Sequence, residues 1–295
     1  MELTSFCEAD LVTILVLSRE GKLGLLFFTE IIMMTMRQTG IYRNPFGYVC
    51  RRKELTNMIR VTVWNEFIHE KEMPEVAATH PGGLHGTIAA ALGEDAEFVV
   101  RTATLDDPEC GLTEEVLRDT DVLFWWGHVG HDRVPDEVVE RVYTHVMCGM
   151  GMVVVHSGHH SKIFRRLMGT PCNLGWHDDS RERVYVVNPA HPIAQGLPPH
   201  FEIPLEECYC EPFSVPEPQE LVFLGWYNTG EVFRAGCTYR RGNGKIFYFQ
   251  PGHETASSFF VPEVQKVYVN AAKWAAPDMR VPELICPHVP ALENV

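Results

Sequence analysis

A chain of 295 residues with 45% hydrophobic and 22% charged residues has the composition of a globular protein with one large domain or two ordinary ones. Its net charge of −14 argues against a nucleic acid or an anionic membrane as its partner. Nine scattered cysteines without a CxxC pair are typical of reduced thiols, so we expect a cytoplasmic protein rather than a disulfide framework.

The first 57 residues differ from the rest, because they contain none of the 14 histidines and none of the six tryptophans. Their apolar run, residues 11–28, is interrupted by charges and is too short to span a bilayer. A strand pattern begins directly after Met58, and the codons of Lys53 and Glu54 can spell a ribosome-binding purine tract. We therefore expect residues 1–57 to be an atypical N-terminal extension. Our hypothesis is a translated leader before a natural start at Met58, and the alternative is a genuine extension.

Strand and helix patterns alternate from residue 58 onwards. Runs of β-branched and aromatic residues predict strands, and apolar residues at helical spacing predict helices. The predicted strands are 59–64, 97–104, 121–126 and 152–155, and the helices that follow them are 84–92, 113–117, 135–147 and 161–168. This alternation favours a parallel sheet with helices on both faces.

The last third of the chain is less regular. Prolines crowd residues 188–218, which we expect to form a long irregular excursion. The remaining patterns predict strands at 184–187, 221–224, 232–239 and 245–249, a closing helix at 257–274 and a tail at 277–295.

The turn after the strand 152–155 carries an unusual set of polar residues. His156, Ser157, His159 and His160 lie between that strand and the helix 161–168. In α/β folds such a turn lies at the carboxyl end of the sheet, where ligands usually bind. We therefore place the candidate site at this turn, with His156 as a catalytic residue and with Ser157 and His160 contacting substrate. A serine nucleophile is disfavoured because the GxSxG pattern is missing.

Further histidines follow other predicted strands. His128 and His131 follow 121–126, and His253 follows 245–249, so these side chains share one edge of the sheet if the strands are parallel. Neutral imidazole is a common metal ligand, and we take His128, His131 and His159 as candidates for a divalent metal, zinc or manganese. No nucleotide cofactor is expected. The competing interpretation is that each histidine is an ordinary hydrogen-bonding loop residue.

Other residues near strand ends are candidates too. Glu207 lies in a cluster of carboxylates and aromatic residues; a carboxylate near the histidines suits proton transfer, although a solvated loop is the alternative. Trp64 and Trp126 can stack on sugar faces or pack in the core. The histidines that follow the first strand are open alternatives for the site: His69, His80 and His85.

Six segments taken together resemble the trehalose-utilisation (ThuA-like) family of the class I glutamine amidotransferase-like superfamily. They are VTVWNE, DVLFWWGHVGHD, GMVVVHSGHHS, HPIAQGLP, EECYCEP and GKIFYFQPGHE, and the resemblance spans residues 59–276. It implies an α/β fold of the flavodoxin-like type, a three-layer sandwich with a mostly parallel central sheet, in a domain of residues 58–276.

The resemblance also bears on the chemistry. Amidotransferases place a nucleophilic cysteine in CxGxQ at this turn, with a distal histidine and glutamate. Aligned by Gly158, this chain has His156 in place of that cysteine, and His253-Glu254 stands near the distal pair. Glutaminase chemistry by the usual route is therefore excluded, and the family implies a role in disaccharide use.

Together these features predict an enzyme that acts on a small sugar derivative, with His156, His253 and Glu207 in acid–base roles. Hydrolysis and isomerisation are both open. The alternative is a non-catalytic sugar-binding or scaffold protein of the same fold. We expect no nucleic acid or membrane partner, and a homo-oligomer is possible through exposed edge strands.

Overall fold

The computed structural model describes residues 41–43, 49–51, 58–286, 288–291 and 293. The chain divides into two units, residues 1–54 and 55–295. In the first unit, the described residues form an antiparallel pair of short strands, β1 (Ile41–Arg43) and β2 (Val49–Arg51). The rest of the predicted extension lies outside the described residues, and its origin as a translated leader stays a prediction.

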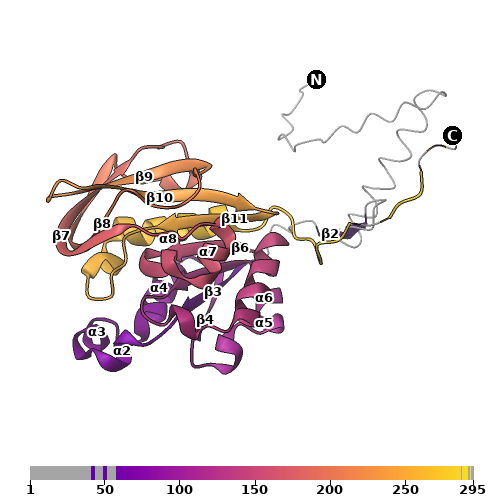
Figure 1. Ribbon diagram of the computed structural model, residues 1–295, viewed down its shortest axis with the longest axis horizontal. Helices are drawn as coiled ribbons and strands as arrows, with labels where there is room; N and C mark the ends of the chain where they lie inside the picture. Colours follow the sequence, from indigo (N-terminus) through magenta and orange to yellow (C-terminus); the bar gives the residue numbers. More distant parts are fainter. Residues whose placement is uncertain (1–40, 44–48, 52–57, 287, 292, 294–295) are drawn as a thin grey trace, which may run out of the picture. The chain divides into compact units, whose positions relative to one another are not determined.

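The second unit is built on a mixed sheet, which has nine strands within residues 58–293 as described (Figure 1). In spatial order these are β4 (Phe98–Thr104), β3 (Ile59–Asn65), β5 (Val122–Trp126), β6 (Gly151–Val155), β11 (Gly244–Phe249), β10 (Val232–Arg241), β9 (Glu220–Tyr227), β7 (Gly175–Val186) and β8 (His200–Cys210). The first five strands run parallel in the order 2-1-3-4-5 that flavodoxin-like sheets share.

The predicted α/β class is confirmed, but the mostly parallel sheet is not. From β11 to β8 every pairing is antiparallel, so the described sheet has four parallel and four antiparallel pairings. The hairpin turn between β10 and β11 lies at the sequence Arg241-Gly242-Asn243-Gly244, which is typical of such turns. In the antiparallel half, β10, β9 and β7 overlap predicted strands, whereas β8 was not predicted.

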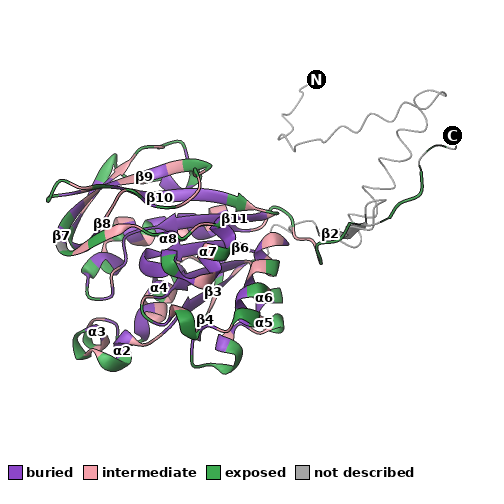
Figure 2. Ribbon diagram, viewed as in Figure 1, coloured by how far each residue is buried: buried purple, intermediate pink, exposed green. Residues whose placement is uncertain are grey.

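Helices cover both faces of the parallel half. Crossovers that leave β3 in opposite directions place their helices on opposite faces when both are right-handed. One layer holds α4 (Gly83–Gly93) and α8 (Pro262–Ala275), which pack on each other, and the other holds α5 (Glu114–Arg118), α6 (Asp136–Met147) and α7 (Lys162–Met168). Strands β5, β6 and β11 lie between these layers and are buried along their whole length (Figure 2).

Short helices occupy the connections. After β3 come α2 (His69–Glu72) and α3 (Pro74–Thr79), which the sequence pattern did not predict, and the 3-10 turns are η1 (Pro108–Gly111), η2 (His131–Arg133), η3 (His156–His160), η4 (Pro192–Ala194) and η5 (Ser257–Phe260). Within the part of the chain that the structure describes, no helix is both long and apolar enough to cross a bilayer.

The predicted irregular excursion at 188–218 was wrong in its middle, because β8 occupies residues 200–210. Pro204 lies inside this strand, and a proline cannot donate a backbone hydrogen bond to a neighbouring strand. The strand tolerates it because β8 is the outermost strand of the sheet. This strand carries Glu206 and Glu207, so the correction changes the environment of a predicted catalytic residue.

Candidate functional site

The turn after β6 has the geometry of a sharp elbow. His156 follows the strand directly and adopts a φ of 52°, a left-handed conformation that is strained for a residue with a side chain. Gly158 permits the turn, because a Cβ atom there would lie 3.1 Å from the carbonyl oxygen of Trp125 and 2.9 Å from Val154. Ser161 then caps α7 by accepting a hydrogen bond from the amide of Phe164.

His156 forms a buried ion pair with Glu207. Its ε nitrogen lies 2.9 Å from a Glu207 carboxylate oxygen, and its δ nitrogen donates to the carbonyl of Gln250 at 2.8 Å. Burial lowers the pKa of His156, but the hydrogen bond and negative charge of Glu207, with the charge of Glu206, outweigh it and raise the pKa overall. Burial likewise raises the pKa of Glu207, and the His156 partner reverses that into a net lowering. The favoured state is therefore imidazolium beside carboxylate.

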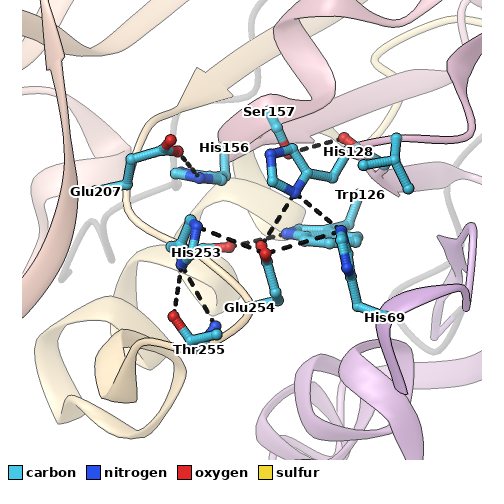
Figure 3. A network of polar contacts seen from close by, with 12 residues as sticks. His69, Trp126, His128, His156, Ser157, Glu207, His253, Glu254 and Thr255 are labelled. Carbon is cyan, nitrogen blue, oxygen red and sulfur yellow. Dashed lines mark hydrogen bonds and ion pairs between the residues drawn. The ribbon is translucent and has the colours of Figure 1, made fainter. Parts of the chain in front are cut away.

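A cleft of about 590 Å³ opens above this pair. It is lined by Met73, His128, His131, Ser157, His159, His160, Asn173, Leu174, Trp176, Asp178, Glu207, Tyr209, His253, Glu254 and Thr255. The predicted convergence of histidines from separate strand ends is thus present in the structure. Figure 3 shows six of the gathered side chains: Glu207 on β8, His156 at the start of η3 after β6, His69 at the start of α2 after β3, and His128, His253 and Glu254 in the loops after β5 and β11.

His156 itself lies beneath the cleft rather than in it. Its side chain is 0% exposed, and its ring stacks on Tyr209 with centroids 4.7 Å apart. A residue without access to the cleft cannot exchange a proton directly with a substrate bound there, so the predicted catalytic role of His156 is corrected in that respect. His156 instead contacts Glu207, which lines the cleft.

The two tryptophans predicted to stack on a sugar lie in the core. Trp64 is 1% exposed and stacks on Trp125 with ring centroids 4.0 Å apart, and its indole donates to the carbonyl of Cys110. Trp126 is 0% exposed and donates to the carbonyl of Gly252. The side chain that does offer an aromatic face is Trp176 on β7, which is 63% exposed and lines the cleft.

Ser157 lines the cleft, but its hydroxyl already donates to the carbonyl of Gly127 at 2.8 Å. That hydrogen bond leaves the hydroxyl able to accept one from a ligand. His160 also lines the cleft, and its ring lies 5.8 Å from that of His131. Both residues therefore lie where a ligand could reach them.

The predicted metal candidates do not come together as one set. His159 donates from its δ nitrogen to the carbonyl of Cys172, and burial lowers its pKa to about 3. His131 has a pKa lowered to about 4, by burial first and then by His160. Both are therefore neutral at pH 7 and form a polar wall.

Three other groups have ligand atoms within 4.8 Å of one another among the described residues. They are His69 with His128 and Glu254, His156 with Glu207 and His253, and His177 with Cys208 and Glu231. His69 and Glu254 thus join His128, whereas the sequence prediction had grouped His128 with His131 and His159. The sequence did contain a signal for these two ligands, since His69 follows the first strand and Glu254 comes directly after His253.

Two buried carboxylates hold the loops that carry the site. Glu66 accepts hydrogen bonds from the amides of Val129 and Gly130 at 2.9 and 2.8 Å. Glu206 accepts from the amides of Gly252 and His253 at 2.9 and 3.0 Å. Satisfied buried hydrogen bonds of this kind fix a loop in one conformation. The loops with His128 and with His253 are therefore preorganised.

Comparison with known proteins identifies a family. Residues 60–275 match the model of the ThuA family, which is described as trehalose utilisation. A solved ThuA-like protein from Parabacteroides merdae is 15% identical, with a TM-score of 0.59 over 78% of this chain and 93% of that one. One from Bacteroides uniformis is 17% identical, with a TM-score of 0.55 over 76% and 94%.

A cytoplasmic protein from Salmonella typhimurium is 10% identical, with a TM-score of 0.53 over 75% of this chain and 100% of that one. At these identities the solved structures establish a shared fold. No curated protein matches the chain.

Proposed function

The chain belongs to the ThuA family of trehalose-utilisation proteins, and on that premise we propose that it is an enzyme that transfers protons on a sugar derivative bound in the cleft. The observation that carries the proposal is the buried His156–Glu207 pair, which faces the cleft through its carboxylate. Hydrolysis and isomerisation both need such a proton acceptor.

Glu207 is the general base in this proposal. Its pKa is lowered overall, so the carboxylate is ionised at pH 7, and its partner His156 keeps it in one orientation. His253 lines the same cleft, and burial followed by the charge of His156 lowers its pKa, so its imidazole is neutral. A carboxylate and a neutral imidazole on one cleft can take a proton from one position of a sugar and return it to another.

The cleft suits a sugar for two reasons. Its volume of about 590 Å³ is within the usual range for small-molecule sites, and imidazoles and carboxylates supply many of its hydrogen-bonding groups. Trp176 adds an exposed aromatic face, and Asp178 lies on the same strand and lines the cleft with it. An aromatic face with a nearby carboxylate can hold the apolar face and the hydroxyl groups of one sugar ring.

Glutamine amidotransfer is not part of the proposal. Histidine stands at the elbow where the resemblance places a nucleophilic cysteine, and the residues that line the cleft include no cysteine. Loss of that thiol also supports the second candidate, a non-catalytic sugar-binding protein. That alternative predicts sugar binding without any product.

Turnover of a panel of disaccharides and their keto derivatives tests both candidates. We expect Glu207→Gln to lower turnover by roughly 10²–10⁴-fold, the usual contribution of general acid–base catalysis. Glu202→Gln is the matched control, because Glu202 lies on the same strand and pairs with Arg181 and Arg183 instead of lining the cleft. Binding without turnover in the unmodified protein would favour the non-catalytic candidate.

Several predictions accompany this function. The ligand is a small sugar, a divalent metal (zinc or manganese) assists at the histidine-rich site, and no nucleotide cofactor takes part. The protein is cytoplasmic and forms a homo-oligomer. Native mass spectrometry of the purified protein would test the oligomeric state.

A further inference from the structure

His69, His128 and Glu254 direct their donor atoms at one point. The ε nitrogen of His69 lies 2.9 Å from the δ nitrogen of His128, and the two Glu254 oxygens lie 3.8 Å from the first nitrogen and 3.3 Å from the second. The three residues follow β3, β5 and β11, so the arrangement results from the parallel sheet (Figure 3). Two imidazole nitrogens so close together have room for only one proton between them. That proton bonds the two rings to each other, so neither nitrogen donates it to the Glu254 carboxylate.

Glu254 provides an independent observation. It is 3% exposed, and its Oε2 atom is buried without a hydrogen-bond partner among the described residues. A buried carboxylate oxygen normally has a donor or a cation as partner, because leaving it unpaired is costly. Ring nitrogens of His69, His128 and His253 lie 3.8, 3.3 and 3.5 Å from the Glu254 carboxylate oxygens. A cation between these atoms would neutralise the carboxylate and would accept the lone pairs of the His69 ε nitrogen and the His128 δ nitrogen.

We propose that His69, His128 and Glu254 bind one divalent transition metal, and that the metal is zinc. Two imidazoles and one carboxylate form one of the ligand sets of catalytic zinc sites, which keep a further position open. Manganese prefers sites richer in oxygen, and ferrous iron can use the same three donors, so competition between metals tests the choice. His128 and Glu254 line the cleft, so the open position is reachable by a ligand there.

The neighbouring groups fit a cation less well. In the group of His156, Glu207 and His253, both nitrogens of His156 already have partners, the Gln250 carbonyl and the Glu207 carboxylate. In the group of His177, Cys208 and Glu231, no member lines the cleft. The His69 group combines open donor atoms, burial and access.

The surrounding structure holds the proposed ligands in place. Glu66 fixes the loop that carries His128, and Glu206 and Trp126 fix the backbone next to Glu254. Such outer partners orient ligands and typically change metal affinity by roughly 10–100-fold when removed. The inference goes beyond the proposed function, because it predicts binding whether or not the protein catalyses a reaction.

The test is zinc binding by the full chain. Protein stripped with a chelator is titrated with ZnCl₂ in a calorimeter, and bound metal is counted by mass spectrometry after dialysis. We expect about one zinc per chain, and a loss of affinity greater than the roughly 10–100-fold cost of an outer partner in His69→Ala, His128→Ala and Glu254→Gln. Titration of Co²⁺ followed by its visible absorption reports the coordination independently of heat.

Two control variants should retain zinc. His131→Ala removes a cleft histidine outside the group, and Cys208→Ser removes the thiol of the third group. Circular dichroism checks that each variant is folded, and Glu254→Gln, which preserves side-chain size, decides the question if an alanine variant does not fold.

Three results would overturn the inference. They are no zinc binding by the unmodified chain, unchanged binding in Glu254→Gln, and loss of zinc in Cys208→Ser with retention in His128→Ala. Tighter binding of Mn²⁺ or Fe²⁺ than of Zn²⁺ would overturn the choice of metal.

Discussion

The ε nitrogen of His156 lies 2.9 Å from a carboxylate oxygen of Glu207, 51 positions further along the chain. The first residue comes from the elbow after the central strand β6, and the second comes from the edge strand β8. The pair connects the parallel half of the sheet to the antiparallel half. His156 is fully buried whereas Glu207 lines the cleft, so Glu207 is the member of the pair that a bound ligand can reach.

His156→Asn should therefore move the acidic limb of the activity profile to higher pH. Without the imidazolium, burial raises the pKa of Glu207, so the base stays protonated up to a higher pH. Asparagine tolerates the left-handed backbone at this position, where φ is 52°, better than alanine does. The measurement is kcat/KM from pH 4 to 9, and an acidic limb at its original pH would show that His156 does not act through Glu207.

Glu206→Gln should destabilise the fold and disturb His253. The carboxylate accepts hydrogen bonds from the amides of Gly252 and His253, and a glutamine turns an NH₂ group toward one of these donors. Loss of a buried partner costs about 1–3 kcal/mol, which urea unfolding can measure. Glu202→Gln, at a half-exposed position of the same strand where ion pairs contribute little, should change the unfolding free energy by no more than about 1 kcal/mol. Equal effects in the two variants would contradict the anchoring role.

Local patterns predicted most of the parallel half of the fold because runs of β-branched and aromatic residues there alternate with segments that have apolar residues at helical spacing. The convergence of histidines followed from the same argument, since parallel strands end at one edge. Strand β8 of the antiparallel half was missed because Pro204 and the neighbouring prolines suggested a loop in what is an edge strand. A local sequence pattern does not show which strand will lie at the edge of the sheet, and only an edge strand tolerates a proline in this way.

The site residues show the same limit. His253 and Glu207 were expected near the elbow, but the depth of His156 depends on Tyr209 and the Gln250 carbonyl, which pack around it from β8 and from the residue after β11. Burial of this kind is a tertiary property, so it cannot be read from the sequence around position 156. For the same reason the sequence did not show that Trp126 is buried and that Trp176 is the exposed aromatic residue.

Trp64→Ala should test the core role of this side chain. Trp64 is buried against Trp125, so truncation would leave a large cavity and lower the free energy of unfolding by about 3–5 kcal/mol. Trp64→Phe keeps most of the ring contact and should cost less. Urea unfolding monitored by circular dichroism gives both values. A stable Trp64→Ala protein with weakened sugar binding would instead restore the predicted sugar contact.

Trp176→Ala should weaken sugar binding while leaving the fold intact. The indole is 63% exposed and lies opposite Tyr209 in the β7–β8 pairing, on the face that lines the cleft. Loss of one aromatic contact is worth about 0.5–1.5 kcal/mol, which corresponds to an increase in Kd of up to about tenfold. Calorimetric titration with the sugar that binds the unmodified protein measures the change. Trp176→Phe should retain most of the affinity, and equal Kd values for all three proteins would refute a stacking role.

His159→Asn should make stability less sensitive to acid. Burial lowers the pKa of His159 to about 3, whereas an unfolded histidine titrates near 6.5. Between these values the unfolded chain binds a proton that the folded chain excludes, so this residue lowers stability as the pH falls from about 6.5 toward 3. Its contribution to the slope is up to about 1.4 kcal/mol per pH unit. Asparagine can still donate to the Cys172 carbonyl but does not titrate.

Urea midpoints at pH 7, 6 and 5 would measure this difference between the unmodified protein and the variant. The variant should lose less stability than the unmodified protein as the pH falls, while His200→Asn, at an exposed position, serves as the control for replacing a histidine. If the urea midpoints of His159→Asn and of the unmodified protein fell equally with pH, the folded protein would protonate His159 as readily as the unfolded chain does. Such a result would contradict a neutral, buried imidazole in the wall of the cleft.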